Sequence, residues 1–156
     1  MVLIVDIETC GDYENAPINV DIDHLKFIGA YDYEQEKYYF YNHNQRDEIR
    51  ALLRRHKEII THNGEDFDIP ILKRHGLWDD GHLSLDTLKI MKNRAKFIGV
   101  HNESFSLSNL AKVFKLENKK DDNFNYSILL KEDFTDKEIQ VLKLYAARIL
   151  EKHKEL

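Results

Sequence analysis

The chain has 156 residues, of which 42% are hydrophobic and 33% are charged, and its formal net charge is −5. This length fits one domain of ordinary size with a real core, and the apolar content excludes a disordered chain. The negative charge argues against a protein that wraps duplex DNA through bulk positive charge. We therefore expect one domain over residues 1–156, with any contact to nucleic acid confined to a local surface.

The sequence has no apolar run of about 20 residues, the length of a membrane-spanning helix. Its first residues lack the basic start and the small-residue cleavage site of a signal peptide. These features predict no membrane association and a cytoplasmic location. Cys10 is the only cysteine, so no internal disulfide forms, in agreement with a reducing compartment. We expect its side chain to pack as a small residue.

The first elements are predicted to be strands. Residues 2–5 form a continuous apolar run, which is typical of a strand buried on both faces of a sheet. Residues 25–33 and 37–41 are rich in Ile, Phe and Tyr and are separated by three polar residues, which predicts a hairpin beside that strand. Three antiparallel strands are therefore expected at the start of the sheet.

Helical spacing begins after the hairpin. Apolar residues at this spacing predict a helix over residues 44–57, with Asn44 as an N-cap signal. Residues 58–61 predict a short strand. A second helix is predicted over residues 66–75, with Gly76 as its C-terminal stop. Strands and helices therefore alternate in the middle of the chain.

The last predicted strand covers residues 83–86, after which the chain becomes helical. Ser106 is expected to cap a helix. The apolar face of that helix is formed by Leu107, Leu110, Ala111 and Phe114. Residues 135–138 form a capping box that opens a long helix toward Glu155. The polar residues 117–125 between these helices predict a surface loop.

Two acidic residues end the first predicted strand. Because side chains alternate along a strand, Asp6 and Glu8 lie on the same face and Ile7 points away from it. Two carboxylates on a buried strand are costly to desolvate unless a cation lies between them, and a divalent ion is the simplest such partner. The alternative is that both carboxylates cap a loop in solvent, because Asp-x-Glu alone is a common pair.

A second motif follows about sixty residues later, where a strand runs into a turn and then into a helix with Asp68 in its first turn. Asp-Ile-Glu-Thr, then His-Asn-Gly-x-x-Phe-Asp-x-x-x-Leu, with the hairpin between them and Ser-Leu-Ser-Asn-Leu-Ala after them, resembles the DEDD (DnaQ-like) 3′-to-5′ exonucleases. The resemblance covers nearly the whole chain and is greatest to the tyrosine-type domains similar to family B polymerase proofreading domains. It implies a ribonuclease H-like α/β fold, a mixed five-stranded sheet with an antiparallel hairpin plus parallel strands, flanked by helices.

The resemblance also implies a reaction. Asp6, Glu8 and Asp68 would bind two Mg²⁺ or Mn²⁺ ions around the scissile phosphate at a single-stranded DNA or RNA 3′ end, and hydrolysis would release a nucleoside 5′-monophosphate. Tyr145 matches the tyrosine of the family's third motif and completes the catalytic set. The residues expected at the substrate are Thr9, Cys10, Asn63 and Phe67. For Phe67, core packing is the favoured alternative.

Three further polar features each have two interpretations. His62 matches the family's motif, and we expect a hydrogen-bonded structural histidine rather than a catalytic one. Asp86 either supports the site from behind or caps a surface helix. A basic strip either contacts phosphates or is a solvated face. The strip consists of Lys89, Lys92, Arg94 and Lys96.

The third motif departs from the family pattern, which places an Asp four residues after the tyrosine. Ile149 stands at that position. Glu151 lies about 240° round the helix from Tyr145, and Glu138 sits two turns before it, so neither is a good replacement. The explanations are a deletion after Arg148, a natural loss, or a helix irregularity or water that lets Glu151 reach the metal. The sequence thus predicts an exonuclease, with impaired activity as one outcome, or a catalytically silent nucleic-acid-binding relative.

Overall fold

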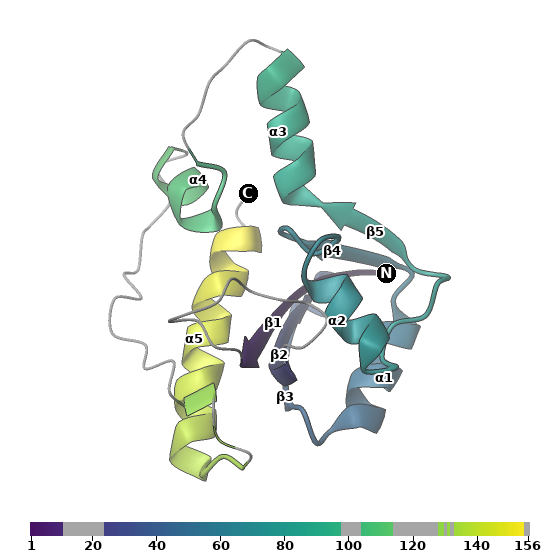
Figure 1. Cartoon of the computed structure of the whole chain (residues 1–156), viewed down its shortest axis with the longest axis vertical. Helices are drawn as coiled ribbons and strands as arrows, with labels where there is room; N and C mark the ends of the chain where they lie inside the picture. Colours follow the sequence, from purple (N-terminus) through teal and green to yellow (C-terminus); the bar gives the residue numbers. More distant parts are fainter. Residues whose placement is uncertain (11–23, 98–103, 114–127, 130, 132, 155–156) are drawn as a thin grey trace.

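A computed structural model gives the architecture, and it describes residues 1–10, 24–97, 104–113, 128, 129, 131 and 133–154. Within these residues one five-stranded sheet has the strand order β3-β2-β1-β4-β5 (Figure 1). The strands are β1 (Val2–Cys10), β2 (His24–Asp32), β3 (Lys37–Asn42), β4 (Glu58–Thr61) and β5 (Leu83–Asp86). The helices are α1 (Arg46–Arg55), α2 (Asp68–Arg74), α3 (Thr87–Phe97), α4 (Leu107–Val113) and α5 (Asp136–Lys154).

The sheet is mixed, as the sequence predicted. Strand β2 pairs antiparallel with both β1 and β3, whereas β4 pairs parallel with both β1 and β5. The predicted central strand is confirmed, because β1 lies in the middle of the sheet and its residues Leu3, Ile4 and Val5 are almost fully buried. The expected ribonuclease H-like α/β fold is therefore confirmed.

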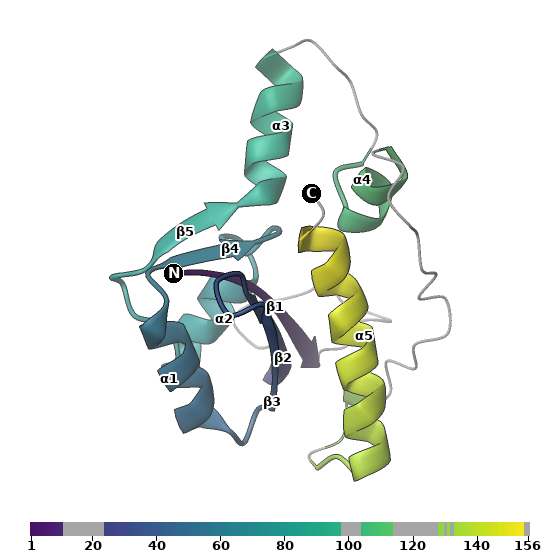
Figure 2. The ribbon, with the colours of Figure 1, turned by 180° about the vertical axis from the view of Figure 1, so that it is seen from behind.

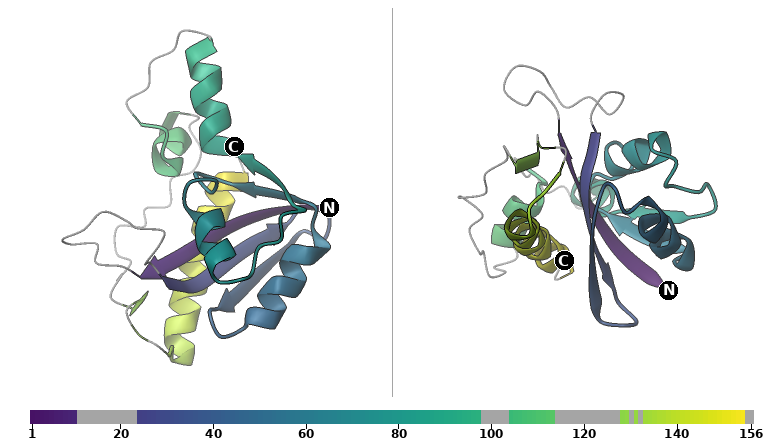
Figure 3. Two further views of the ribbon diagram at one scale, coloured as in Figure 1. Left: turned by 45° about the vertical axis from the view of Figure 1, so that its right-hand side comes forward. Right: turned by 90° about the horizontal axis from the view of Figure 1, so that it is seen from below.

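Helices cover both faces of the sheet. Figure 3 shows the sheet edge-on, with α1 and α2 against one face and α5 against the other. Leu3, Val5 and Ile7 of β1 belong to the larger core, on the α1 and α2 side. Ile4 packs with Leu150 of α5 on the opposite face. The alternation of β1 side chains therefore determines which residues meet α5.

The start of α1 differs from the prediction, in which Asn44 was the N-cap. Gln45 occupies the N-cap position and makes no side-chain capping hydrogen bond. The polar side chains stabilise the preceding turn instead: Asn42 Oδ1 accepts the amide of Asn44 at 3.0 Å, and Gln45 Oε1 accepts the amide of Asn42 at 3.1 Å. The Asn44 capping prediction was wrong because the helix begins one residue later than that cap requires, after a turn held by the side chains of Asn42 and Gln45.

Helix α2 ends at the predicted glycine. Gly76 has a φ of 68°, the left-handed conformation that favours glycine. The amide of Gly76 donates to the carbonyl of Lys73 at 2.9 Å, and the amide of Leu77 donates to the carbonyl of Leu72 at 2.9 Å. These two bonds form a Schellman motif, and both leucines are buried in the larger core. The helix itself is shorter than the predicted residues 66–75 because residues 64–67 form a turn.

The later helical signals are confirmed where the structure describes them. Ser106 Oγ accepts the amide of Asn109 at 3.2 Å, and Thr135 and Glu138 exchange the two bonds of a capping box at 3.0 and 3.2 Å. The Ala111 side chain, Phe114 and residues 117–125 lie outside the described residues.

Helix α3 was not given separate bounds in the sequence analysis. It follows β5 directly and stands clear of the sheet (Figure 2). Among the helices that the structure describes, none is long and apolar enough to cross a membrane.

Candidate metal centre

Strand β1 presents Asp6 and Glu8 to the face that α5 covers. In the pairing of β1 with β2, Asp6 lies opposite Gly29 and Glu8 lies opposite Phe27, which packs against α5. The register shifts immediately after Glu8, a β-bulge of the kind found beside functional sites. Glu8 is 9% exposed and Asp6 is half-buried. Both carboxylates are thus held in the interior rather than in a solvated loop.

Asp68 reaches this pair from the first residue of α2. Its Oδ1 accepts the backbone amide of Ile7 at 3.1 Å. Because Ile7 stands between Asp6 and Glu8, this bond places the third carboxyl group beside the other two. Asp68 is 4% exposed, so the group is buried together with its neighbours. The structure therefore brings together the three predicted metal ligands.

The turn before α2 has two residues with special backbone requirements. Asn63 has a φ of 66°, a left-handed conformation that asparagine adopts more readily than most residues. A Cβ on Gly64 would lie 2.1 Å from Oγ1 of Thr61, so only glycine fits against the end of β4. The carbonyl of Gly64 then accepts the amide of Ile69 at 2.8 Å. This tight turn fixes where α2 begins and thereby where Asp68 lies.

Asp86 organises the same corner from the end of β5. Its carboxylate accepts the amides of Asn63 at 2.9 Å and Glu65 at 3.1 Å, and it also accepts the amides of Leu88 and Lys89 at the start of α3. Asp86 is 2% exposed, so the helix cap that the sequence suggested is buried rather than on the surface. The residue caps α3 and braces the turn that positions the third carboxylate.

The three carboxyl groups have strongly perturbed acidity. Burial raises the pKa of Asp6 to about 7, although a hydrogen bond from Glu8 opposes this shift. Burial raises the pKa of Glu8 well above its usual range, and the charges of Asp6 and Asp68 add to the effect. The pKa of Asp68 rises for the same reasons, burial first and the charge of Asp6 second. Among the described residues no basic side chain forms an ion pair with any of them.

A divalent cation fits this donor set. Carboxylate oxygens are the ligands that Mg²⁺ prefers, and three buried acids without a cationic partner need compensating charge. Within the described residues no three acidic, His or Cys side chains already have the geometry of a metal site. Asp6 and Glu8 instead share a hydrogen bond, and Asp68 is held by the Ile7 amide. A metal ion held by these three residues would therefore displace the proton that Asp6 and Glu8 share.

Helix α5 passes very close to the carboxylates because a glycine faces it. A Cβ on Gly29, the partner of Asp6, would lie 3.0 Å from Cβ of Ala146 and 3.2 Å from Cδ1 of Leu150. Leu150 packs with Ile4 of β1 and Tyr31 of β2. His153 turns the other way, toward the end of β4 and α3. The helix therefore has one flank on the β3 side and one on the side of the carboxylates.

The predicted third-motif residues lie on the second flank. Residues four apart stack along one side of an α-helix, so Tyr145 and Ile149 share a side with His153. Both Tyr145 and Ile149 are half-buried. The helix thus directs Ile149, an apolar residue, to the flank where the family pattern has its fourth carboxylate.

Glu151 lies beside Lys154 on the other flank of α5. Helix α5 is α-helical along its whole described length, Asp136–Lys154, so it has no irregularity that would turn Glu151 toward the carboxylates. Glu151 lies 3.4 Å from the ammonium of Lys154, which itself lies 4.6 Å from the ring centroid of Tyr31. Tyr31 belongs to the β2 and β3 side. The helix irregularity is therefore absent from the described part of α5, and the route from Glu151 to the metal through a water stays a prediction.

Two histidines connect the elements around the site. His62 Nδ1 lies 2.8 Å from Oγ1 of Thr87, and its Nε2 lies 2.8 Å from the carbonyl oxygen of Phe105. The same Thr87 hydroxyl lies 3.0 Å from Nε2 of His153. Burial lowers the pKa of His62, and burial together with His62 lowers the pKa of His153 to about 4. These contacts agree with the structural interpretation of His62.

Sequence reasoning missed His153, which no motif marks. The available signal was its position four residues after Ile149 on the buried side of the long helix. Through Thr87 it joins α5 to the start of α3, and Thr87 follows Asp86 directly. His153 thus helps hold α5 against the corner that carries the acids.

The predicted substrate residues are mostly packed. Thr9 is 3% exposed, and Cys10 packs beside the cluster that contains Phe27. Phe67 packs against the larger core, which supports the packing interpretation of this residue. Asn63 lies in the turn braced by Asp86. None of these contacts tests the proposed substrate roles.

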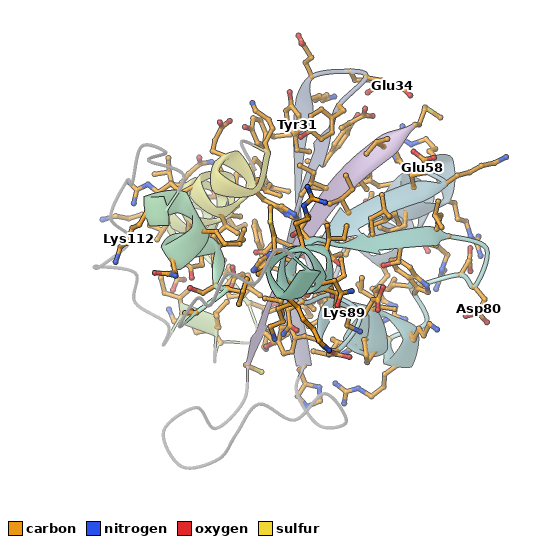
Figure 4. All side chains as sticks on the ribbon, turned by 90° about the horizontal axis from the view of Figure 1, so that it is seen from above. Tyr31, Glu34, Glu58, Asp80, Lys89 and Lys112 are labelled. Atoms are coloured by element: carbon orange, nitrogen blue, oxygen red, sulfur yellow. The ribbon has the colours of Figure 1, made fainter. Side chains whose placement is uncertain are left out.

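The predicted basic strip lies on α3. Lys89, labelled in Figure 4, is 2.7 Å from a carboxylate oxygen of Glu65 and 3.3 Å from one of Asp66, so its charge is already compensated. Lys92 and Lys96 are exposed. Figure 4 also shows Lys112 of α4 on a different side of the molecule. The charge of Lys89 is therefore compensated, and contact of the exposed residues of the strip with phosphates stays a prediction.

Comparisons with known proteins agree with this architecture. The family model of the RNase H superfamily matches residues 3–143. Among solved structures, the family B DNA polymerase from the hyperthermophilic archaeon Pyrobaculum calidifontis matches with a TM-score of 0.68 and 14% sequence identity over 99% of this chain. The chain spans 24% of the length of that polymerase, and this likeness shows the fold alone. No curated protein gives a significant match.

Proposed function

Because the chain belongs to the RNase H superfamily, whose members are generally metal-dependent nucleases, we propose that it is a 3′-to-5′ exonuclease of the DEDD type with impaired activity. The observation that carries this proposal is the 3.1 Å hydrogen bond from the Ile7 amide to Asp68. It brings a third buried carboxyl group to the Asp6 and Glu8 pair. A structural role alone does not account for three adjacent buried acids without a basic partner among the described residues.

The proposed substrate is the 3′ end of a single-stranded DNA or RNA, and the products are nucleoside 5′-monophosphates. Two bound Mg²⁺ or Mn²⁺ ions would supply a water of lowered pKa and stabilise the leaving oxygen. Asp6, Glu8 and Asp68 would hold these ions, and Asp86 keeps the turn that carries Asp68 in place. Tyr145 of α5 would supply the tyrosine of the third motif. The role that remains unfilled is that of the fourth carboxylate, at Ile149.

A second candidate function rests on Ile149 itself. An apolar side chain on the flank of α5 that faces the carboxylates cannot ligate a metal ion or orient a water. The chain would then be a catalytically silent relative that binds single-stranded nucleic acid through the same surface. This candidate differs from the first only in turnover, so both are tested in one assay.

The test uses a 5′-labelled single-stranded oligonucleotide with Mg²⁺ or Mn²⁺. We expect slow, metal-dependent shortening that is lost in Asp6→Asn and Asp68→Asn. Asp80→Asn is the matched control, because its side chain is 92% exposed and it pairs with Lys73 at the surface. Equal shortening by all three variants would mean that a contaminating nuclease or another site is responsible.

The second candidate predicts a different pattern in the same experiment. Fluorescence anisotropy would show binding of the oligonucleotide while no metal concentration gives shortening. A chain that neither binds nor shortens single strands would reject both candidates.

A further inference from the structure

A cavity lies at the end of the sheet, between the start of α1 and the end of α2. Its volume is about 400 Å³. The residues that line it are His24, Leu25, Lys26, His43, Asn44, Arg46 and His75. They come from the start of β2, the connection from β3 to α1, the first residue of α1 and the residue after α2. None of them belongs to the candidate metal centre, although Cys10 of β1 pairs with His24.

The walls of the cavity are held in place by backbone contacts. The amide of Leu25 donates to Nε2 of His75 at 3.3 Å, and the guanidinium of Arg46 donates to the carbonyl oxygen of His75. The amide of His43 donates to the carbonyl of Lys26 at 3.0 Å. These bonds join β2, α1 and the end of α2. The cavity is therefore a built feature of the fold.

Cationic groups gather at this cavity in a chain whose net charge is −5. Burial lowers the pKa of His75, and the nearby groups of Arg74, Arg46, His24 and His43 lower it further. His24 and His75 lie edge to face, with ring centroids 6.3 Å apart. Among the described residues no carboxylate forms an ion pair with Arg46. Arg46 and the neighbouring histidines thus give the cavity a basic lining.

The basic side chains around the cavity differ in their hydrogen-bond partners. Nδ1 of His43 is buried and has no hydrogen-bond partner among the described residues. The N-cap residue of α1, Gln45, supplies no side-chain acceptor to the first turn of the ten-residue helix. The ammonium of Lys26 is different, because it donates to the carbonyl of Lys131 at 2.8 Å and is already satisfied. Lys26 is therefore set apart from the other basic residues that line the cavity, His24, His43, Arg46 and His75, which we call the basic pocket.

The chemistry of the basic pocket favours an anion over a metal ion. Histidines can bind metals, but the guanidinium of Arg46 beside them would repel a cation, and the described residues contain no group of three potential ligands with the geometry of a metal site. Arginine and histidine donors together match the oxygens of a phosphate group. The volume leaves space for more than the phosphate alone. We propose that the basic pocket binds the phosphate of a small nucleotide or of a nucleic-acid backbone.

Histidine NMR resonances of the full chain provide the readout for the test, in EDTA so that metals do not contribute. Inorganic phosphate, a nucleoside 5′-monophosphate and a short single-stranded oligonucleotide are titrated separately. We expect saturable shifts of the resonances of His24, His43 and His75. Tighter binding of the oligonucleotide than of the monophosphate assigns the pocket to a nucleic-acid backbone, and the reverse order assigns it to a free nucleotide or phosphate.

Arg46→Gln should weaken the binding about tenfold or more, since it removes a charge-assisted donor. Arg54→Gln is the matched control, because Arg54 lies on the same helix but pairs with Asp79 at 2.7 Å. We expect less than about a twofold change in this variant. His24→Gln is a second test, which replaces Arg46→Gln if that substitution disturbs the helix. His24 is exposed, and its substitution should also weaken binding.

Two results would overturn the proposal: no saturable shift of these histidines with any of the three ligands, or equal weakening by Arg46→Gln and Arg54→Gln. Asp68→Asn separates this proposal from the exonuclease proposal. Binding in the basic pocket should survive that substitution, whereas metal-dependent shortening should not.

Discussion

The two sides of the candidate metal centre differ in the charge of their side chains. The corner formed by β1, β4 and α2 presents the half-buried Asp6 and the buried Glu8 and Asp68, all with a raised pKa. The flank of α5 that faces this corner presents Ile149 and the buried, neutral His153. One side is therefore built of unpaired acids, and the other of groups that carry no charge at neutral pH.

The two sides therefore have opposite effects on the stability of the metal-free fold. Apolar Ile149 and hydrogen-bonded His153 stabilise the contact between α5 and the sheet at little cost. The three carboxyl groups instead reduce the stability of the metal-free fold whenever they ionise. The tight turn, the β-bulge and the buried Asp86 cap hold these carboxyl groups together although burying their charge destabilises the fold. A ligand that compensates the charge explains this arrangement best. The corner of β1, β4 and α2, which we call the acidic corner, thus has the donor chemistry that the proposed metal ions require, and Ile149 on the helix flank does not.

Introducing an acid on α5 is the strongest test of this difference between the acidic corner and the helix flank. Ile149→Asp should raise metal-dependent exonuclease activity by about 100-fold, because it adds a carboxylate to the side that lacks one. The measurement is the initial rate of shortening of a 5′-labelled single strand. Leu144→Asp is the control, since Leu144 lies on the outer face of α5 and is 62% exposed.

A gain in Leu144→Asp as large as in Ile149→Asp would show that added charge, and not its position, changes the rate. If Ile149→Asp binds metal, shown by calorimetry, and still has no activity, the helix flank is not the place where the missing group acts.

A substitution in the turn before α2 should disrupt the acidic corner. In Gly64→Ala the new Cβ would lie within 2.1 Å of Oγ1 of Thr61, so the end of β4 or the start of α2 must move. We expect a loss of about 3 kcal/mol in the free energy of unfolding, measured by urea denaturation. Gly81→Ala is the control, because nothing lies within 4 Å of its added Cβ. Equal stability of both variants would mean that the turn does not fix the position of Asp68.

Much of this corner was predictable from sequence because its signals are local. Strand alternation put Asp6 and Glu8 on one face, and a glycine stop ended α2 at Gly76. The fold class followed from the order of these motifs and from their resemblance to a known superfamily. These features depend on neighbours close in the chain, where period and turn chemistry are informative.

The parts that escaped prediction depend on distant contacts. Asp86 accepts amides from two separate segments, and His153 meets His62 through Thr87, which no sequence spacing indicates. The capping role given to Asn44 failed because α1 begins at Arg46, which puts Gln45 at the N-cap position. The basic pocket assembles histidines from three elements that no motif links.

The pH dependence of the free energy of unfolding, without metal, measures how much the carboxyl groups of the acidic corner destabilise the fold. Folding raises the pKa of Asp68 above its value in the unfolded chain, so the folded state binds more protons at neutral pH. The stability of the metal-free protein should therefore fall as the pH rises from about 4 to about 8. Asp68→Asn should be more stable than the parent at about pH 8 in EDTA, by about 1–3 kcal/mol, and this gain should shrink near pH 4.

Urea denaturation at each pH measures this difference, and Asp80→Asn provides the exposed control. Adding Mg²⁺ or Mn²⁺ at about pH 8 should stabilise the parent and leave Asp68→Asn almost unchanged. If the stability of the parent protein rises over this pH range, ionisation of the carboxyl groups does not destabilise the metal-free fold.

The smallest expected effect concerns Glu151, the acid nearest in sequence to Ile149. Because α5 is continuous, Glu151 points to the flank opposite the carboxylates and pairs with Lys154. Glu151→Gln should change metal-dependent activity by less than about twofold and stability by less than about 0.5 kcal/mol, as is typical of a solvent-exposed ion pair. A loss of activity comparable with that of Asp68→Asn would place Glu151 at the metal and remove the contrast between the two sides. An unchanged rate leaves α5 without a carboxylate of its own, so that any activity rests on the three acids of the opposite corner.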